Sequence, residues 1–152
     1  MTTDQLIPVK ILLVEDNAGD VELAREALES SKFLNELHVV EDGVYAIDFL
    51  KKRKAYKDVP RPDIILLDLN LPRLDGRAVL KEIKQDDALK TIPVVVLTTS
   101  RAEEDILRSY KLHANCYITK PLDLQQFFNV VKNIKEFWMS IVKLPPSEQG
   151  NG

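Results

Sequence analysis

The chain has little of several features that mark specialised classes of protein. Its 152 residues include a single cysteine, Cys116, which excludes an intrachain disulfide and suits a reducing compartment. No apolar run approaches the roughly 20 residues that a membrane helix needs. The first residues have neither the basic region nor the apolar core of a signal peptide. The sequence therefore predicts a cytoplasmic protein that does not associate with a membrane.

An excess of charge of one sign is also lacking. The net charge of −3 comes from 21 basic and 24 acidic residues, whereas binding to nucleic acid needs concentrated lysine and arginine. We therefore expect no nucleic-acid partner, and we interpret a short basic run at residues 51–54 as a solvated helix end. The chain is long enough to bury the core of one domain. We expect that domain at residues 9–142, after a disordered lead (1–8) and before a flexible tail (143–152).

Short apolar runs alternate with segments of helical periodicity. Strands are expected at residues 9–14, 37–40, 64–67, 94–97 and 116–118. Helices are expected after Asp20, at residues 44–54 and 77–85, around Ile106, Leu107 and Tyr110, and at residues 123–142. This alternation predicts an α/β fold with a five-stranded parallel sheet covered on both faces.

Polar side chains follow four of the five expected strands. They are Glu15 with Asp16, Asp68, Thr98 and Lys120. Because parallel strands end on one edge of a sheet, we expect these groups to converge there. Three carboxylates in one place repel one another unless a cation neutralises them. Oxygen ligands without histidine or cysteine favour Mg²⁺.

The same groups could hold a phosphoryl group on a carboxylate. Lys120 can bind a phosphoryl oxygen as a point charge, the hydroxyl of Thr98 can donate a hydrogen bond to it, and Asp68 can form an acyl phosphate. Taken singly, an acidic pair is usually a helix cap, and the threonine and lysine are ordinary turn or loop residues. The joint pattern at the strand ends favours the phosphoryl site.

At this point the motifs resemble those of a known family. They are Ile-Leu-Leu-Val-Glu15-Asp16, Leu-Leu-Asp68-Leu-Asn70-Leu-Pro72, Val-Val-Leu-Thr98 and Tyr117-Ile-Thr-Lys120-Pro121. In this order they resemble the receiver domain of two-component response regulators, over about residues 8–140. The resemblance implies a flavodoxin-like, doubly wound (βα)5 fold with strand order 2-1-3-4-5. It also implies a phosphorelay function, with Asp68 as the acceptor of a phosphoryl group from a histidine of a sensor kinase.

The resemblance implies further roles, residue by residue. The ligands of Mg²⁺ would be Glu15, Asp16, Asp68 and the main-chain carbonyl of Asn70. Thr98 would be the switch hydroxyl, Tyr117 the aromatic residue that follows it, and Lys120 the lysine that binds the phosphoryl group. Asn70 and Ser100 occupy positions that tune the lifetime of the phosphoryl group.

A narrower resemblance concerns the partner. The enlarged loop around residues 51–60 and the ending Glu136-Phe-Trp138 look like the small cyanobacterial-type regulators that partner phytochrome kinases. This implies a phytochrome as the sensor kinase and a light-sensing phosphorelay.

The last expected helix has more apolar surface than one sheet-facing stripe requires. Its apolar positions are spaced three and four residues apart, at Leu124, Phe127, Val131, Ile134, Trp138 and Ile141, with Phe128, Phe137 and Val142 beside them. Either the helix has a broad core-facing side or it also packs on a second copy. We hypothesise a homodimer with Phe127, Phe128, Val131, Ile134, Phe137 and Trp138 at its surface.

Three alternatives stay open at this stage. A flavodoxin-like FMN binder would need a hydroxyl- or glycine-rich phosphate loop where Glu15 and Asp16 stand. A phosphatase with an aspartate nucleophile would need a second acid close after Asp68. A receiver-like module could also act without phosphorylation. We expect no enzyme beyond Mg²⁺-dependent self-phosphorylation and slow self-dephosphorylation. No output domain is expected after Val142, so a downstream protein target or phosphotransfer protein would receive the signal.

Overall fold

The computed structural model describes residues 8–31, 34–98 and 116–120, and the single helical positions Gln125, Asn129, Lys132, Asn133 and Glu136. Strands and helices alternate along it. The elements are β1 (Val9–Val14), α1 (Ala18–Glu29), β2 (Asn35–Val40), α2 (Gly43–Leu50), the short 3-10 helix η2 (Lys54–Tyr56), β3 (Ile64–Asp68), α3 (Gly76–Gln85), β4 (Val94–Thr98) and β5 (Cys116–Thr119).

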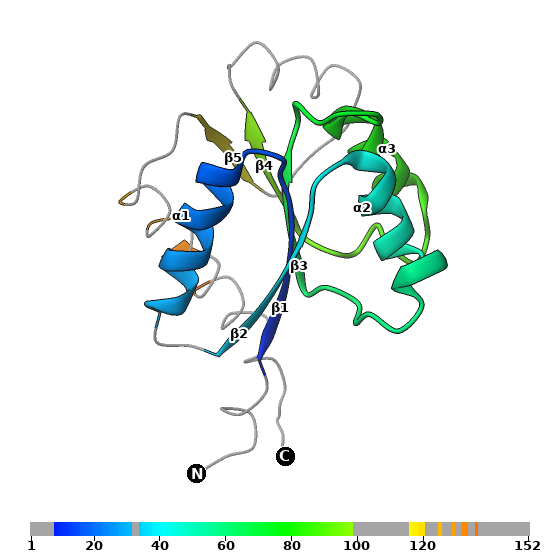
Figure 1. The fold of residues 1–152 in the computed structure, drawn as a ribbon. Coiled ribbons are helices and arrows are strands. Elements are labelled where there is room, and N and C mark those ends of the chain that lie inside the picture. Colours follow the sequence, from blue (N-terminus) through cyan, green and yellow to red (C-terminus); the bar gives the residue numbers. More distant parts are fainter. Residues whose placement is uncertain are drawn as a thin grey trace.

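The five strands form one parallel sheet in the order β2-β1-β3-β4-β5. Helix α1 covers one face of the sheet, and α2 and α3 cover the other (Figure 1). The order reverses between β1 and β3, the place where open α/β sheets put their binding crevice. The predicted doubly wound α/β fold and its strand order are confirmed.

Alternate residues of the central strands point into two separate cores. Leu12, Ile65 and Leu67 pack with α2 and α3, whereas Ile11 and Leu66 pack with α1. All five are at most 2% exposed. Strands buried on both faces read as continuous apolar runs, because both sets of alternating side chains meet helices. This explains the runs that the sequence shows before each polar strand end.

The main differences from the predicted boundaries are in β2, α1 and α2, whereas β3, β4, β5 and α3 are each one residue longer than predicted. Strand β2 begins at Asn35, two residues early. Helix α1 begins at Ala18, before Asp20, and its cap is Asn17, whose Oδ1 accepts the Asp20 N–H at 2.9 Å. Helix α2 ends at Leu50 rather than near residue 54. Lys52 has a φ of 56°, a left-handed conformation that no α-helix continues through.

Several expectations fall on residues that the structure does not describe. These are the helix around Ile106, Leu107 and Tyr110, and most of the helix at residues 123–142, of which five positions are helical. The basic run is solvated as predicted, with residues 52–54 exposed, but it follows α2 and is not a part of that helix. In the described part of the chain, every helix is too short or too polar to serve as a membrane span.

Candidate functional site

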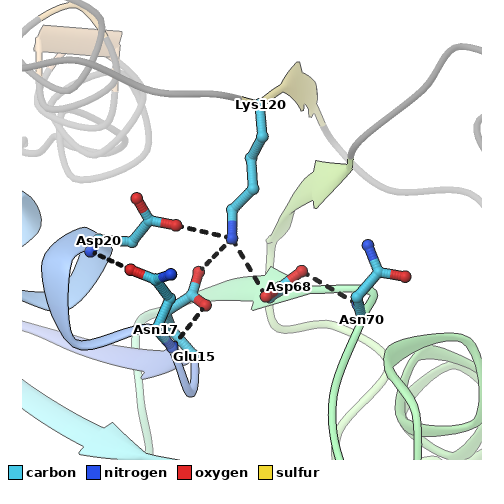
Figure 2. A network of polar contacts seen from close by, with 6 residues as sticks. All are labelled: Glu15, Asn17, Asp20, Asp68, Asn70 and Lys120. Carbon is cyan, nitrogen blue, oxygen red and sulfur yellow. Dashed lines mark hydrogen bonds and ion pairs between the residues drawn. The ribbon is translucent and has the colours of Figure 1, made fainter.

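The first acidic residues of the site follow β1 directly. Glu15 is fully buried and Asp16 is exposed. The carboxylate of Glu15 accepts the Asn17 N–H at Oε2, at 3.1 Å. Because Asn17 also caps α1, the turn from strand to helix is fixed on both sides, and Glu15 points to the carboxyl edge of the sheet (Figure 2).

Asp68 ends β3 beside Glu15 and is only 2% exposed. Its Oδ1 accepts the Asn70 N–H at 3.0 Å, so the following loop folds back over the carboxylate. Gly76 begins α3 directly against this strand end: a Cβ there would lie 2.3 Å from the Asp68 carbonyl oxygen. Only glycine permits this close approach, which gives the Asp75-Gly76 pair of the sequence a structural role.

Lys120 reaches the same place from the end of β5. Its Nζ lies 2.8 Å from Glu15 Oε1, 2.8 Å from Asp20 Oδ2 and 3.2 Å from Asp68 Oδ2 (Figure 2). Its own N–H donates to the Thr98 carbonyl at 2.7 Å, which ties the loop to the last residue of β4. The predicted convergence of Glu15, Asp68 and Lys120 on one edge is therefore present.

Asp20 is a member of this cluster that the sequence reasoning assigned only to the start of a helix. It lies in the first turn of α1, three residues after the N-cap. The first turn of the helix after β1 stands above the carboxyl edge of the sheet. An acid there can serve the helix dipole and contact the site as well. Its position in the first turn of the helix that follows β1 was the signal in the sequence that could have identified Asp20 as a site residue.

The carboxylates offer a site that fits a divalent cation. One ligand oxygen each from Glu15, Asp16 and Asp68 lies within 4.8 Å of the others. Although Lys120 stands close to Glu15 Oε1 as an ion pair, this buried oxygen accepts no hydrogen bond of good geometry. A buried acceptor with spare capacity beside two further carboxylates is suited to a hard cation such as Mg²⁺ or Mn²⁺.

The electrostatics follow from burial and crowding. Burial, and then the neighbouring carboxylate of Asp68, raise the pKa of Glu15 to about 7. Burial by itself would lower the pKa of Lys120, but its contacts with Asp20 and Glu15 and the charge of Asp68 raise it above the usual value. The lysine is thus firmly charged, and a cation at this site would compete with a proton on Glu15.

Only some of the remaining predicted site residues lie in the described part of the chain. Thr98 is fully buried at the end of β4, one residue beyond the partner of Asp68 in the sheet register. Asn70 is exposed in the loop after β3. Tyr117 lies on β5, paired with Val96, but its ring lies outside the described part. So do Ser100 and the proposed dimer residues Phe127, Phe128, Val131, Ile134, Phe137 and Trp138.

Comparison with known proteins agrees with this geometry. The model of the response regulator receiver domain matches residues 11–132. The chain belongs to the response regulator receiver family. It is a two-component signalling protein, as the sequence motifs predicted, and family membership disfavours the FMN binder and the phosphatase.

Individual relatives narrow the comparison to regulators associated with phytochromes. Response regulator Rcp1 of Synechocystis is 50% identical over 145 residues, which cover 95% of this chain and 99% of that protein. The crystal structure of a phosphorylated cyanobacterial phytochrome response regulator, RcpA, is 54% identical with a TM-score of 0.79, over 92% of this chain and all of that one. The Mn²⁺-bound form of Rcp1 is 51% identical with a TM-score of 0.78, over 91% of this chain and all of that one.

Proposed function

We propose that Asp68 accepts a phosphoryl group from a histidine of a sensor kinase and that the chain passes the signal on by changed protein contacts. The observation that carries this is the set of groups around one buried carboxylate. Asp68 Oδ2 lies 3.2 Å from Lys120 Nζ, and its ligand oxygen lies within 4.8 Å of those of Glu15 and Asp16. A buried aspartate with a purely structural role would not require a lysine and two further carboxylates around it.

The transfer itself needs little from the protein beyond position and charge. As the bond from phosphorus to the kinase imidazole breaks, a bond from phosphorus to an Asp68 oxygen forms. Lys120 binds one transferred oxygen, and the Thr98 hydroxyl donates to another. Asn70 holds Asp68 through the 3.0 Å hydrogen bond from its N–H, which fixes the direction of the attacking carboxylate.

The cation of this site is proposed to be Mg²⁺. Glu15, Asp16 and Asp68 would hold it together with the main-chain carbonyl of Asn70. When bound, it supplies positive charge that lets an anionic phosphoryl donor approach three carboxylates. The buried Oε1 of Glu15, which pairs with Lys120 but accepts no hydrogen bond of good geometry, supports this assignment.

Phosphorylation is proposed to act as a two-state switch. Thr98 would move toward the phosphoryl group, and Tyr117 would follow it inward and reshape the surface of β5 and the last helix. A group that contacts only one of two states shifts their populations. Asn70 and Ser100 would set the lifetime of the aspartyl phosphate before the chain hydrolyses it. Self-phosphorylation and slow self-dephosphorylation are the only reactions proposed for this chain.

The partners proposed are a phytochrome kinase, a second copy of the chain and a downstream protein or phosphotransfer protein. Similarity to RcpA and Rcp1 supports the phytochrome. The seam of apolar residues at positions 124–141 supports the homodimer. The receiver boundaries at residues 9–142, the flanking lead and tail, and a cytoplasmic location stay predictions from the sequence.

The test is phosphorylation of the purified chain by acetyl phosphate with Mg²⁺. Intact-mass spectrometry should find one acid-labile phosphoryl group on the wild type and none on Asp68→Asn. Asp87→Asn is the matched control, because the Asp87 side chain is 94% exposed and pairs with Lys90 on the surface. Labelling that persists in Asp68→Asn, or a wild type that takes up no phosphate, would refute the proposal and favour an unphosphorylated module.

The kinase is tested separately. A phytochrome from the same genome, autophosphorylated with labelled ATP, should lose its label to the wild type within minutes and keep it in the presence of Asp68→Asn. Equal transfer from unrelated sensor kinases would argue against the phytochrome as partner while leaving the phosphoacceptor assignment intact.

A further inference from the structure

The loop between β3 and α3, residues 69–75, is fastened to a distant part of the chain. It carries Asn70, whose N–H binds Asp68 and whose carbonyl is the proposed fourth metal ligand. Its backbone is unfavourable at one place: Arg73 has a φ of 61°, in the left-handed region that residues with side chains rarely adopt. A loop in such a conformation needs contacts from outside to hold it.

One such contact is an ion pair between Arg73 and Asp42, the last residue before α2. Arg73 donates to Asp42 Oδ2 from Nε at 2.8 Å, and a second guanidinium nitrogen lies 2.7 Å from the same oxygen. The guanidinium also lies over the Tyr45 ring, 4.6 Å from its centroid, an arrangement that adds attraction between cation and ring. Three interactions thus converge on one side chain.

Asp42 is built to receive this contact. Its side chain is 10% exposed, and its other oxygen, Oδ1, accepts the Tyr45 N–H at 2.8 Å as the cap of α2. A carboxylate this buried requires a partner for its charge. The arginine therefore satisfies Asp42 while Asp42 holds the arginine and the loop behind it.

The two backbones also touch beside the ion pair. A Cβ on Gly43 would lie 1.7 Å from the Leu74 carbonyl oxygen, so only glycine allows the start of α2 to press against this loop. The contact fixes where Leu74 can lie, and the ion pair fixes Arg73 next to it. Together they hold the stretch that runs from the Asp68 carboxylate to Asp75, the N-cap of α3.

We propose that the Arg73–Asp42 pair is a latch that positions the metal-binding loop, so that divalent-cation affinity depends on two side chains that touch neither the cation nor the phosphoryl group. This inference rests on the proposed function of Glu15, Asp16, Asp68 and Asn70 as the metal site. Groups that orient metal ligands from behind commonly change affinity by roughly 10- to 100-fold when removed.

The test is the affinity of the full chain for Mn²⁺, measured from the electron paramagnetic resonance signal of free Mn²⁺. Arg73→Ala and Asp42→Asn should each raise the Kd about 10-fold. Asp42→Asn keeps an oxygen to cap α2 and removes only the charge. Because each substitution opens the same latch, the double variant should bind no more weakly than either single one.

Arg25→Ala is the matched control. Arg25 pairs with Glu22 at 3.5 Å on the outer surface of α1, with 43% of its side chain exposed, and its loss should leave the Kd within 2-fold of wild type. An unchanged Kd in Arg73→Ala, or single effects that simply add in the double variant, would overturn the latch. A wild type with no Mn²⁺ affinity would instead overturn the metal site on which the latch depends.

A second readout separates positioning from general destabilisation. Without metal, amide hydrogen exchange in Arg73→Ala should speed up at Asn70 and Leu74, whose N–H groups bind Asp68 Oδ1 and the Pro72 carbonyl. Exchange at Leu66 in the middle of β3 should stay as in wild type. A uniform increase at all three amides would mean that Arg73 merely stabilises the fold, and the latch would be rejected.

Discussion

The apolar part of β3 and the carboxylate that ends it are buried to nearly the same degree: Leu67 is 0% exposed and Asp68 is 2% exposed. Burial stabilises the first residue and opposes the charge of the second. The leucine needs only neighbours of the right shape, which α2 and α3 provide. The aspartate needs partners from outside its strand, and it finds the Lys120 Nζ at 3.2 Å and the Asn70 N–H at 3.0 Å. The centre of the sheet stabilises the fold, whereas its carboxyl edge buries charged groups at a cost in stability.

The largest effect is expected at the apolar centre of β3. Leu67→Ala should lower the free energy of unfolding by about 3 kcal/mol, because a close-packed core does not collapse fully around the cavity. Urea unfolding followed by circular dichroism measures this loss. Leu34→Ala is the matched control: Leu34 is 49% exposed, and its truncation should change stability by less than about 0.5 kcal/mol. Equal losses in the two variants would mean that the centre of the sheet is not the source of stability.

At the carboxyl edge, removal of the positive charge of Lys120 should lower the free energy of unfolding almost as much. Lys120→Met in the absence of metal at pH 8 should lower the free energy of unfolding by roughly 3 kcal/mol, because Glu15 and Asp68 are then buried without their partner. Lys90→Met removes an exposed pair with Asp87 and should cost less than about 0.5 kcal/mol. Equally small losses of stability in Lys120→Met and Lys90→Met would contradict the importance of the buried lysine.

Most of the fold could be predicted from the sequence, because strands that are buried on both faces have uninterrupted runs of apolar residues. All five strands were predicted within two residues. Where the prediction erred, the cause was local chemistry. Helix α2 stops at Leu50 although its composition continues to look helical, since Lys52 turns left-handed. Helix α1 begins at Ala18, before Asp20, because the Asn17 side chain caps it and Asp20 lies within its first turn.

The site was predictable to the extent that each member ends or directly follows a strand. Asp68 and Thr98 end a strand, Glu15 and Lys120 directly follow one, and parallel topology places all four at one edge of the sheet without any knowledge of distances. Asp20 and the Arg73–Asp42 pair share no such pattern. They belong to a helix turn and to two loops, where contacts depend on backbone geometry such as the close approach at Gly43. Loop geometry is not encoded in periodicity, so these residues needed the structure.

The pH dependence of stability should separate the edge from the centre. The pKa of Glu15 is about 7 in the folded chain against 4.5 as its ordinary value. Between these values the folded state binds the proton that the unfolded state has lost. The free energy of unfolding of the metal-free chain should therefore fall as pH rises from about 5 to 7, by about 2 kcal/mol.

This fall is checked by urea unfolding at pH 5, 6, 7 and 8 with a chelator. Glu15→Gln lacks the titrating group and should be nearly flat over the same range. Saturating Mg²⁺ should remove most of the fall in wild type, because the cation replaces the proton at the carboxylates. A wild-type profile that rises toward pH 7 would contradict the raised pKa of Glu15.

The smallest effect compares the two aspartates at the opposite ends of β3. Asp68→Asn removes one of three crowded charges while its Oδ1 can still accept the Asn70 N–H. In the absence of metal the variant should therefore gain about 1 kcal/mol, because the contact with Lys120 already offsets most of the repulsion among the carboxylates. Asp63→Asn is the control just before the strand, where the carboxylate accepts the Lys10 N–H at 2.8 Å and has no ion pair among the described residues; it should gain nothing. Thermal unfolding with a chelator distinguishes them. A gain in stability at Asp68 with none at Asp63 would show that the charge of Asp68 destabilises the folded chain, as expected of a site that binds a cation and a phosphoryl group. Equal changes in the two variants would show no such difference between the two aspartates.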